Sequence, residues 1–300
     1  MSRSLKPYVL LVKSKMPPSN VAPFSFCISM ALSLIFTSVL VGRDLISLLG
    51  NLILSLLSMA ATALSAYIYN DIIDVEIDRV NRRNRPLVTG EASQNHARNI
   101  VIFLGTIGLI SALIINSKVF LLMLTFFTLC FLYSFPRSNL KRKFLIRDLT
   151  IATGTAITYL IGSVAVGIIS APILLMAVVG FVVALSASIL KDFGDIIGDD
   201  IHQIKTLPIV WGPTQTIRFA MALVSSVGIA TVVGYFQLGF NTAFPILASC
   251  AFAAWIFVIY PLYHHRNEPS YLVNARMIVI KRIAPICFSI QMLTMLGTIM

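Results

Sequence analysis

The sequence predicts an all-α integral membrane protein with nine transmembrane helices. Hydrophobic residues make up 57% of the 300 positions and charged residues only 12%, which is about half the charged fraction of an ordinary soluble domain. The mean hydropathy is +0.88. Apolar segments close to the ~20 residues that cross a bilayer recur along the whole chain. No second soluble domain is evident, so we expect one polytopic membrane domain over residues 1–300.

The nine expected helices follow one another with short connections. In chain order, the apolar segments lie at 21–42, 48–70, 98–116, 118–136, 146–169, 171–190, 214–236, 242–263 and 278–299. The connections at 116–118 and 169–171 are so short that the chain could be divided differently at these two points.

The distribution of Lys and Arg supports a count of nine. If the N-terminus lies in the cytoplasm, every one of the 23 Lys and Arg residues except Arg43 and Lys118 falls on the cytoplasmic side. Such a bias is typical of membrane proteins, and an error in the helix count would disrupt it. We therefore expect a multi-pass protein of the cell membrane. The net charge of +11 then suits anionic headgroups or substrates and does not indicate nucleic acid.

One acidic pattern, D-x-x-D-x-x-x-D, occurs twice. The first acidic frame is Asp71, Asp74 and Asp78, and the second is the set Asp192, Asp195 and Asp199; together they hold half of the 12 acidic residues. On a helix, positions i, i+3 and i+7 lie within about 60° of one another, so each frame presents three carboxylates from one face. Like charges on one face need a compensating cation, and hard oxygen ligands favour Mg²⁺ with a phosphorylated substrate.

Each frame follows a predicted membrane helix, the second and the sixth, and leads into a basic loop. Arg85 and Pro86 follow the first frame, and Lys205 and Pro208 follow the second. Metal ions that bridge carboxylates to phosphate oxygens, together with Arg or Lys on the remaining oxygens, are a typical arrangement for binding a diphosphate. The alternative is that these charges belong to two solvated loops without a binding role. The repetition of one spacing in a chain with so few acidic residues argues against this alternative.

These residues resemble the two signatures of the UbiA-type intramembrane prenyltransferases. Asn70 with the first frame, followed by Asn84-Arg85-Pro86, is similar to the first signature. Lys191 with the second frame, followed by Lys205-Thr206, is similar to the second signature. The resemblance implies a helical bundle around a central cavity, capped by two Asp-rich cytoplasmic loops after helices 2 and 6. It also implies that Mg²⁺ there holds a polyprenyl diphosphate, whose ionisation yields an allylic cation that an acceptor captures.

The resemblance also implies roles for individual residues. The expected metal ligands are Asn70, Asp71, Asp74, Asp78, Asp192, Asp195 and Asp199, the six aspartates being the catalytic set. The expected substrate contacts are Asn70, Arg85, Lys191 and Lys205, joined by the weaker candidates Tyr133, Lys141 and Asn20. The chain departs from the family pattern at Arg147-Asp148, where Gly-Asn is often found.

The acceptor remains open between two classes. The residues of the second frame resemble those of the archaeal-type members that attach a geranylgeranyl chain to geranylgeranylglyceryl phosphate, a membrane lipid precursor. The alternative is an aromatic acceptor of quinone biosynthesis. A transporter is disfavoured because the acids gather at one face, whereas a transport pathway also needs polar groups near the midplane.

Overall fold

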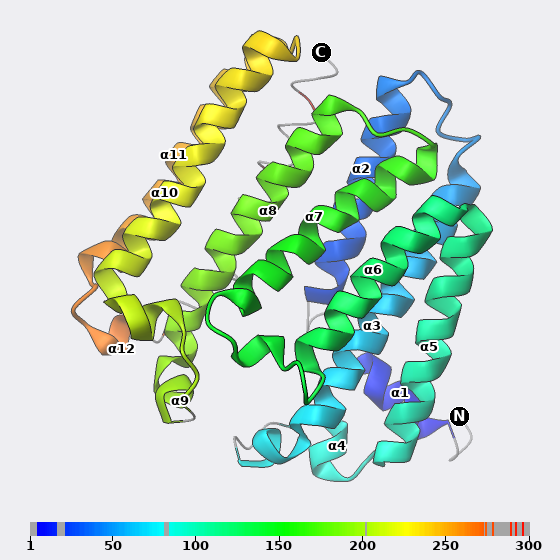
Figure 1. Ribbon diagram of the computed structural model, residues 1–300, viewed down its shortest axis with the longest axis vertical. Coiled ribbons are helices and arrows are strands. Elements are labelled where there is room, and N and C mark those ends of the chain that lie inside the picture. The colour runs from blue at the N-terminus through cyan, green and yellow to red at the C-terminus, as the bar shows by residue number, and fades with distance from the viewer. Residues whose placement is uncertain are drawn as a thin grey trace. The chain divides into compact units, whose positions relative to one another are not determined.

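The computed structural model describes residues 5–16, 22–80, 84–201 and 203–272, with the single positions 274, 278, 289, 292 and 296. Within these residues all secondary structure is helical (Figure 1). The elements are α1 (Lys6–Lys13), α2 (Ala22–Leu40), α3 (Leu49–Val80), α4 (Pro86–Thr89), α5 (Gln94–Ile115), α6 (Ser117–Ser134), the 3-10 helix η1 (Leu140–Arg142), α7 (Ile146–Val166), α8 (Ala171–Lys191), the 3-10 helix η2 (Asp192–Asp195), α9 (Ile196–Ile201), α10 (Leu207–Gln237), α11 (Ala243–His264) and α12 (Pro269–Leu272).

Eight helices of the described part of the chain are long and apolar enough to cross a membrane. They are α2, α3, α5, α6, α7, α8, α10 and α11, and they coincide with the first eight predicted segments. The ninth segment, predicted at 278–299, lies almost entirely outside the described residues. The count of nine therefore stays a prediction.

The chain forms two compact units. Unit 1 comprises Met1–Leu140 and Ile157–Ile168, and unit 2 comprises Lys141–Ala156 and Ile169–Met300. Helix α7 contributes its first half to unit 2 and its second half to unit 1. The expectation of a single domain over the whole chain stays a prediction.

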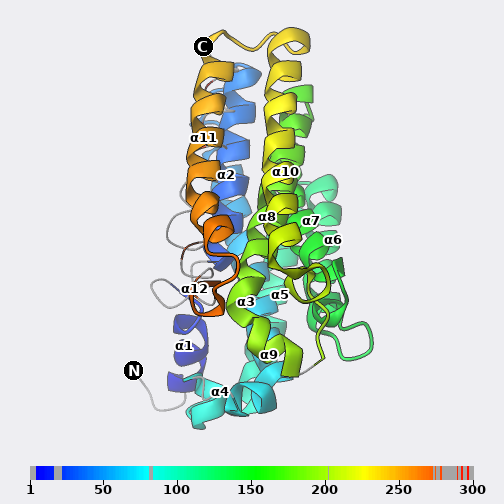
Figure 2. The ribbon, with the colours of Figure 1, turned by 90° about the vertical axis from the view of Figure 1, so that its left-hand side faces the viewer.

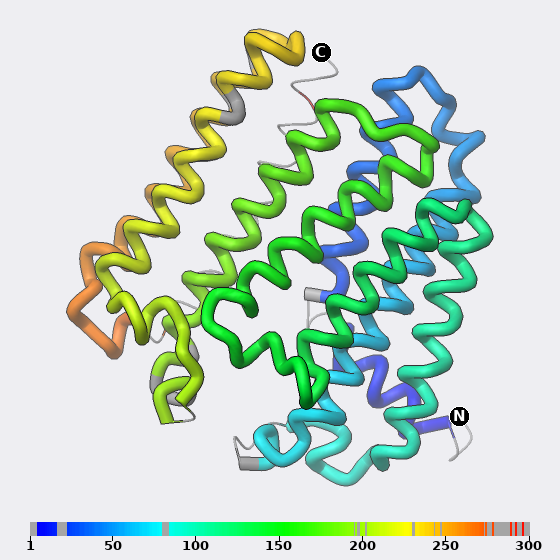
Figure 3. Tube along the Cα trace, viewed as in Figure 1, coloured from blue at the N-terminus to red at the C-terminus, as the bar shows by residue number. Residues whose placement is uncertain are grey.

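Small residues set the helix packing of unit 1. A Cβ atom on Gly162 would lie 2.3 Å from the carbonyl oxygen of Met30, and a Cβ on Gly108 would lie 2.2 Å from the Thr62 hydroxyl oxygen. The Ser58 hydroxyl donates to the Gly108 carbonyl at 2.6 Å. Small residues and interhelical hydrogen bonds of this kind let helices approach closely in a membrane, where no hydrophobic effect drives them together. They bring α3 against α5, which runs antiparallel to α6 beside it (Figure 3).

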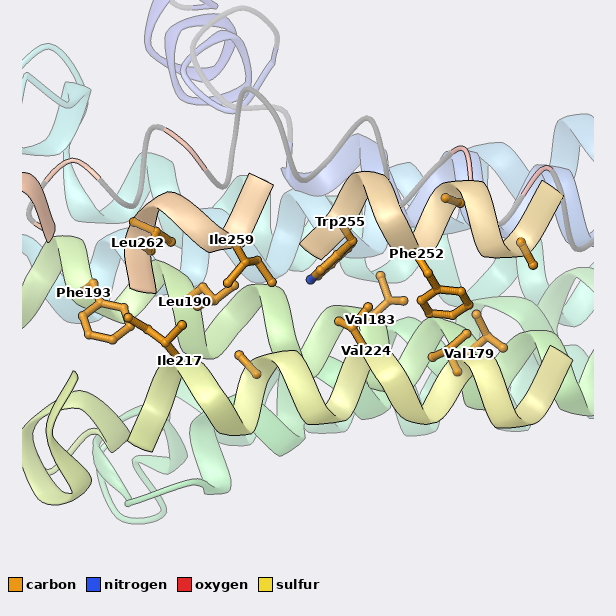
Figure 4. Close-up of a cluster of buried hydrophobic side chains, with 14 of the residues drawn as sticks. Val179, Val183, Leu190, Phe193, Ile217, Val224, Phe252, Trp255, Ile259 and Leu262 are labelled. Carbon is orange, nitrogen blue, oxygen red and sulfur yellow. The ribbon is translucent and has the colours of Figure 1, made fainter. Parts of the chain in front are cut away.

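The core of unit 2 lies between α8, α10 and α11. Helix α10 packs against both of the others (Figure 2). Val183, Val224, Trp255 and Ile259 are among the side chains that meet there (Figure 4), and all four are buried. Helix α10 is interrupted at Gly212, which has a φ of 74° and precedes Pro213. This break explains why the apolar segment was expected to begin only at 214, although the helix begins seven residues earlier.

The acidic frames are helical rather than looped, which corrects the expectation of two Asp-rich loops. Helix α3 has 32 residues and continues through the whole first frame to Val80. A helix of that length spans roughly 48 Å, well beyond the ~30 Å hydrocarbon core, so its last turns carry carboxylates past the apolar layer. The second frame begins in η2 and continues into α9.

Candidate active site

The first acidic frame presents Asp71 and Asp78 from one face of α3, as their helical spacing predicts. The Arg85 guanidinium lies beside both: its Nη1 donates to Asp71 Oδ1 at 2.5 Å and also to Asp78 Oδ2. The Asp71 and Asp78 side chains are only 2% and 3% exposed. One arginine therefore bridges the first and third carboxylates of the frame in a nearly buried setting.

Arg85 reaches this position because the chain turns sharply after α3. Arg85 is the N-cap of α4 and is extended, with φ −117° and ψ 147°. The following Pro86 favours that conformation because its ring excludes the helical region for the preceding residue. Gly90 ends α4 with a φ of 79°, a left-handed conformation that suits glycine. The Asn84-Arg85-Pro86 sequence thus fixes the backbone from which the guanidinium returns to the frame.

Lys15 is a second cation of this cluster. Its ammonium contacts Asp71 Oδ2, and the Lys15 and Asp71 side chains are 5% and 2% exposed. Burial lowers the pKa of the Lys15 ammonium, while the adjacent Asp71 carboxylate opposes this effect. Arg85 and Lys15 together supply two positive charges beside the Asp71 and Asp78 carboxylates, and Arg and Lys are the side chains that bind phosphate oxygens.

Asn70 connects the first frame to α6. Its amide nitrogen donates to the Ser134 hydroxyl at 2.7 Å. The neighbouring Tyr133 is half-buried, and Tyr69 stacks on Phe131 with ring centroids 4.5 Å apart. The end of α6, which carries the predicted Tyr133, therefore lies beside the start of the acidic frame.

Asp192 and Asp199 of the second acidic frame lie beside Arg147, at the N-terminus of α7. Arg147 Nη2 contacts Asp192 Oδ2, and Nη1 lies 3.5 Å from Asp199 Oδ2. Its Nε lies 3.9 Å from Asp148, whose carboxylate accepts a 2.6 Å hydrogen bond from the Ser188 hydroxyl. Asp148, Asp192 and Ser188 are all buried. Here too, one arginine bridges the first and third carboxylates of the frame.

The remaining predicted residues differ in their exposure. Lys191 is half-buried at the end of α8, Lys141 is half-buried in η1, and Lys205 is exposed before α10. The turn that leads to Lys205 is held by the Ile204 amide, which donates to the Asp199 carbonyl at 2.8 Å. Asp74 lies on α3 between the two bridged carboxylates. Asn20 and the side chain of Asp195 lie outside what the structure describes.

Sequence reasoning did not predict two cations of the candidate site, Lys15 and Arg147, or the buried hydrogen bond between Ser188 and Asp148. Lys15 is not among the site residues expected from the sequence, and Arg147 with Asp148 stands there only as a departure from the Gly-Asn that the family often has. Ser188 lies in an apolar helix and gave no signal. The departure at Arg147-Asp148 was the one local clue, because a charged pair inside an apolar segment needs a partner.

The donor set of both clusters fits a hard divalent cation. Asp71 Oδ2 and Asp192 Oδ2 are buried oxygens, each in contact with one cationic side chain, Lys15 and Arg147 respectively, and carboxylate oxygens are preferred Mg²⁺ ligands. Among the described residues, no three His, Cys, Asp or Glu side chains are arranged to hold a metal ion as they stand. The described carboxylates are instead arranged around basic side chains.

The fold and these clusters define a polytopic helical membrane protein in which one acidic frame occurs twice. Residues 30–273 match the UbiA prenyltransferase family. The chain belongs to this family.

Curated relatives carry a more specific name. The chain is 38% identical over 166 residues to the digeranylgeranylglyceryl phosphate synthase of Thermococcus sibiricus, covering 55% of this chain and 57% of that protein. It is 28% identical over 228 residues to the protein of the same name from Sulfurisphaera tokodaii, covering 75% of this chain and 80% of the relative. The match to the Thermococcus protein thus spans just over half of its length.

Solved structures share the fold. A structure described as digeranylgeranylglyceryl phosphate synthase in membranes has a TM-score of 0.77 and 23% identity, and the match covers 99% of both chains. A UbiA homologue from Archaeoglobus fulgidus, bound to GPP and Mg²⁺, has a TM-score of 0.66 and 20% identity, covering 96% of this chain and 99% of that one.

Proposed function

We propose that this protein transfers a geranylgeranyl group from its diphosphate to geranylgeranylglyceryl phosphate, forming an ether bond of an archaeal-type membrane lipid. The observation that carries the proposal is the duplicated acidic frame, in which buried carboxylates and a bridging arginine occur twice in a UbiA-family chain. The names of the Thermococcus and Sulfurisphaera relatives support this acceptor.

The residues of the first cluster suit the diphosphate of the donor. Asp71, Asp74 and Asp78 would hold Mg²⁺, and Arg85 and Lys15 would bind diphosphate oxygens. Bound Mg²⁺ supplies Lewis-acid stabilisation of the charge that develops on the leaving diphosphate. Arg85 and Lys15 add fixed positive charge at the same place, and fixed charge needs no reorganisation during the reaction.

The residues of the second cluster also suit a diphosphate. Asp192, Asp195 and Asp199 would hold Mg²⁺, with Lys205 and Lys191 as phosphate contacts. Asp71→Asn and Asp192→Asn should each lower prenyl transfer strongly, because each removes a proposed metal ligand.

The bundle explains how the allylic cation survives. Long isoprenoid chains are delivered from the bilayer, and an apolar environment excludes the water that would quench the cation. The acceptor hydroxyl oxygen then bonds to C1 of the prenyl chain. We further propose that the N-terminus and both acidic frames face the cytoplasm, which the positive-inside distribution of Lys and Arg supports.

The acceptor is tested with purified protein, labelled geranylgeranyl diphosphate and Mg²⁺. Geranylgeranylglyceryl phosphate and a hydroxybenzoate are offered together, and products are identified by mass spectrometry. The expected product carries an ether oxygen on prenyl C1. A prenylated aromatic ring as the main product would overturn the lipid acceptor and leave the prenyl donor standing.

A further inference from the structure

Arg147 occupies the centre of the second acidic cluster. Its side chain is 15% exposed, and it approaches Asp192, Asp199 and Asp148 through three different nitrogen atoms. Asp148 is held in place by the Ser188 hydroxyl. Because a guanidinium keeps its charge under all ordinary conditions, it is a permanent counter-cation for these carboxylates.

The oxygen atoms that Arg147 contacts include those a divalent cation would need. Asp192 Oδ2 faces Arg147 Nη2 directly, and Asp199 Oδ2 faces Nη1. A divalent cation that coordinates these oxygens competes with the guanidinium, because two positive groups close together on the same oxygens repel each other. The displaced guanidinium would then lie beside any diphosphate that the same metal binds, where its planar fork suits two phosphate oxygens.

We propose that Arg147 is an exchangeable counter-cation that competes with Mg²⁺ for Asp192 and Asp199 and, once displaced, binds the diphosphate. This role rests on the proposed Mg²⁺–diphosphate function of the second frame. It gives Arg147 two effects of opposite sign: it weakens the binding of Mg²⁺ alone and strengthens the binding of diphosphate in the presence of Mg²⁺.

A purely structural ion pair would behave differently. Removal of one partner from a buried ion pair leaves uncompensated charge and loosens the site. A loosened site would bind both Mg²⁺ and diphosphate less well. The opposite signs of the two effects therefore distinguish exchange from simple support.

The test measures binding to purified Arg147→Gln protein, with no prenyl donor and no acceptor. Calorimetry with Mg²⁺ alone is expected to show binding tighter than wild type by about 10-fold or more, because a charge-assisted contact no longer has to be broken. Calorimetry with inorganic diphosphate at saturating Mg²⁺ is expected to show binding weaker by about 10- to 150-fold. Lys143→Gln is the matched control, because it removes an exposed positive charge one turn away and should leave both affinities at the wild-type value.

A second variant covers the case in which Arg147→Gln does not fold. Arg147→Lys keeps the positive charge but replaces the planar guanidinium with a single ammonium. The gain in Mg²⁺ affinity and the loss of diphosphate affinity should therefore both remain but be smaller. Unchanged or weaker Mg²⁺ binding in the folded variant would overturn the exchange role. Wild-type protein that binds neither Mg²⁺ nor diphosphate would instead reject the proposed function itself, and this role of Arg147 with it.

Discussion

Replacement of Lys15 by Met should destabilise the protein strongly, because Lys15 and Asp71 form an almost fully buried ion pair. The two side chains are 5% and 2% exposed. Breaking a buried pair by removing one partner costs about 3–5 kcal/mol, since the remaining charge is left without full compensation. Arg85 still contacts Asp71 at 2.5 Å, so we take the lower end, about 3 kcal/mol.

The assay is thermal unfolding of the purified protein in detergent. A loss of about 3 kcal/mol corresponds to a fall in Tm of roughly 5–10 °C for a chain of this size. Lys13→Met is the matched control, because Lys13 lies two residues earlier and is exposed; its Tm should stay within a degree or two of wild type.

A double variant isolates the pair. Lys15→Met with Asp71→Asn removes both charges at once, and replacing both partners of a buried pair is often close to neutral. We expect the double variant to regain most of the lost Tm. A Lys15→Met protein as stable as the Lys13→Met control would refute the reasoning, and so would a double variant less stable than Lys15→Met, because either result means that Asp71 does not depend on the Lys15 charge.

Three further outcomes follow from the structure. Asp74→Ala should lower Mg²⁺-dependent prenyl transfer by orders of magnitude because it removes a metal ligand, and EDTA should abolish the wild-type activity; near-normal turnover in the variant would remove Asp74 from the metal site. Gly162→Ala should lower the Tm because its Cβ would lie within 2.3 Å of the backbone of α2, whereas Gly50→Ala, with nothing within 4 Å, should not; equal Tm values for the two variants would contradict the close packing. Ser188→Ala should destabilise the protein by about 1–3 kcal/mol because it deprives the buried Asp148 of a hydrogen bond, which denaturant titration would detect, and a change below 0.5 kcal/mol would mean that another group replaces the hydroxyl.

The membrane helices could be predicted because hydropathy is a local property. Eight predicted segments coincide with helices, and only their ends differ. Helix α3 extends well beyond the predicted end at residue 70, because a hydropathy pattern stops at the first carboxylates while the hydrogen-bonded helix does not. The start of α10 was missed for the related reason that Gly212 and Pro213 interrupt its apolar run.

The cations of the candidate site were harder to predict because they arrive through tertiary structure. Arg85 belongs to the same short segment as the first frame, and its assignment followed from a local motif. Lys15 precedes α2 in the chain, and Arg147 is separated from the second frame by two membrane helices, α7 and α8. Nothing in the spacing of either residue indicates which carboxylate it contacts.

The two arginines give the acidic spacing a physical meaning. In the first frame, positions i and i+7 are two helical turns apart on one face, and the Arg85 side chain lies against both carboxylates at once. In the second frame, Arg147 contacts the same two positions although the chain passes there from a 3-10 turn into α9. An arginine thus bridges the first and third carboxylates in both frames, although the local backbone and the position of the arginine in the chain differ. In both frames, therefore, a guanidinium lies between the first and the third carboxylate.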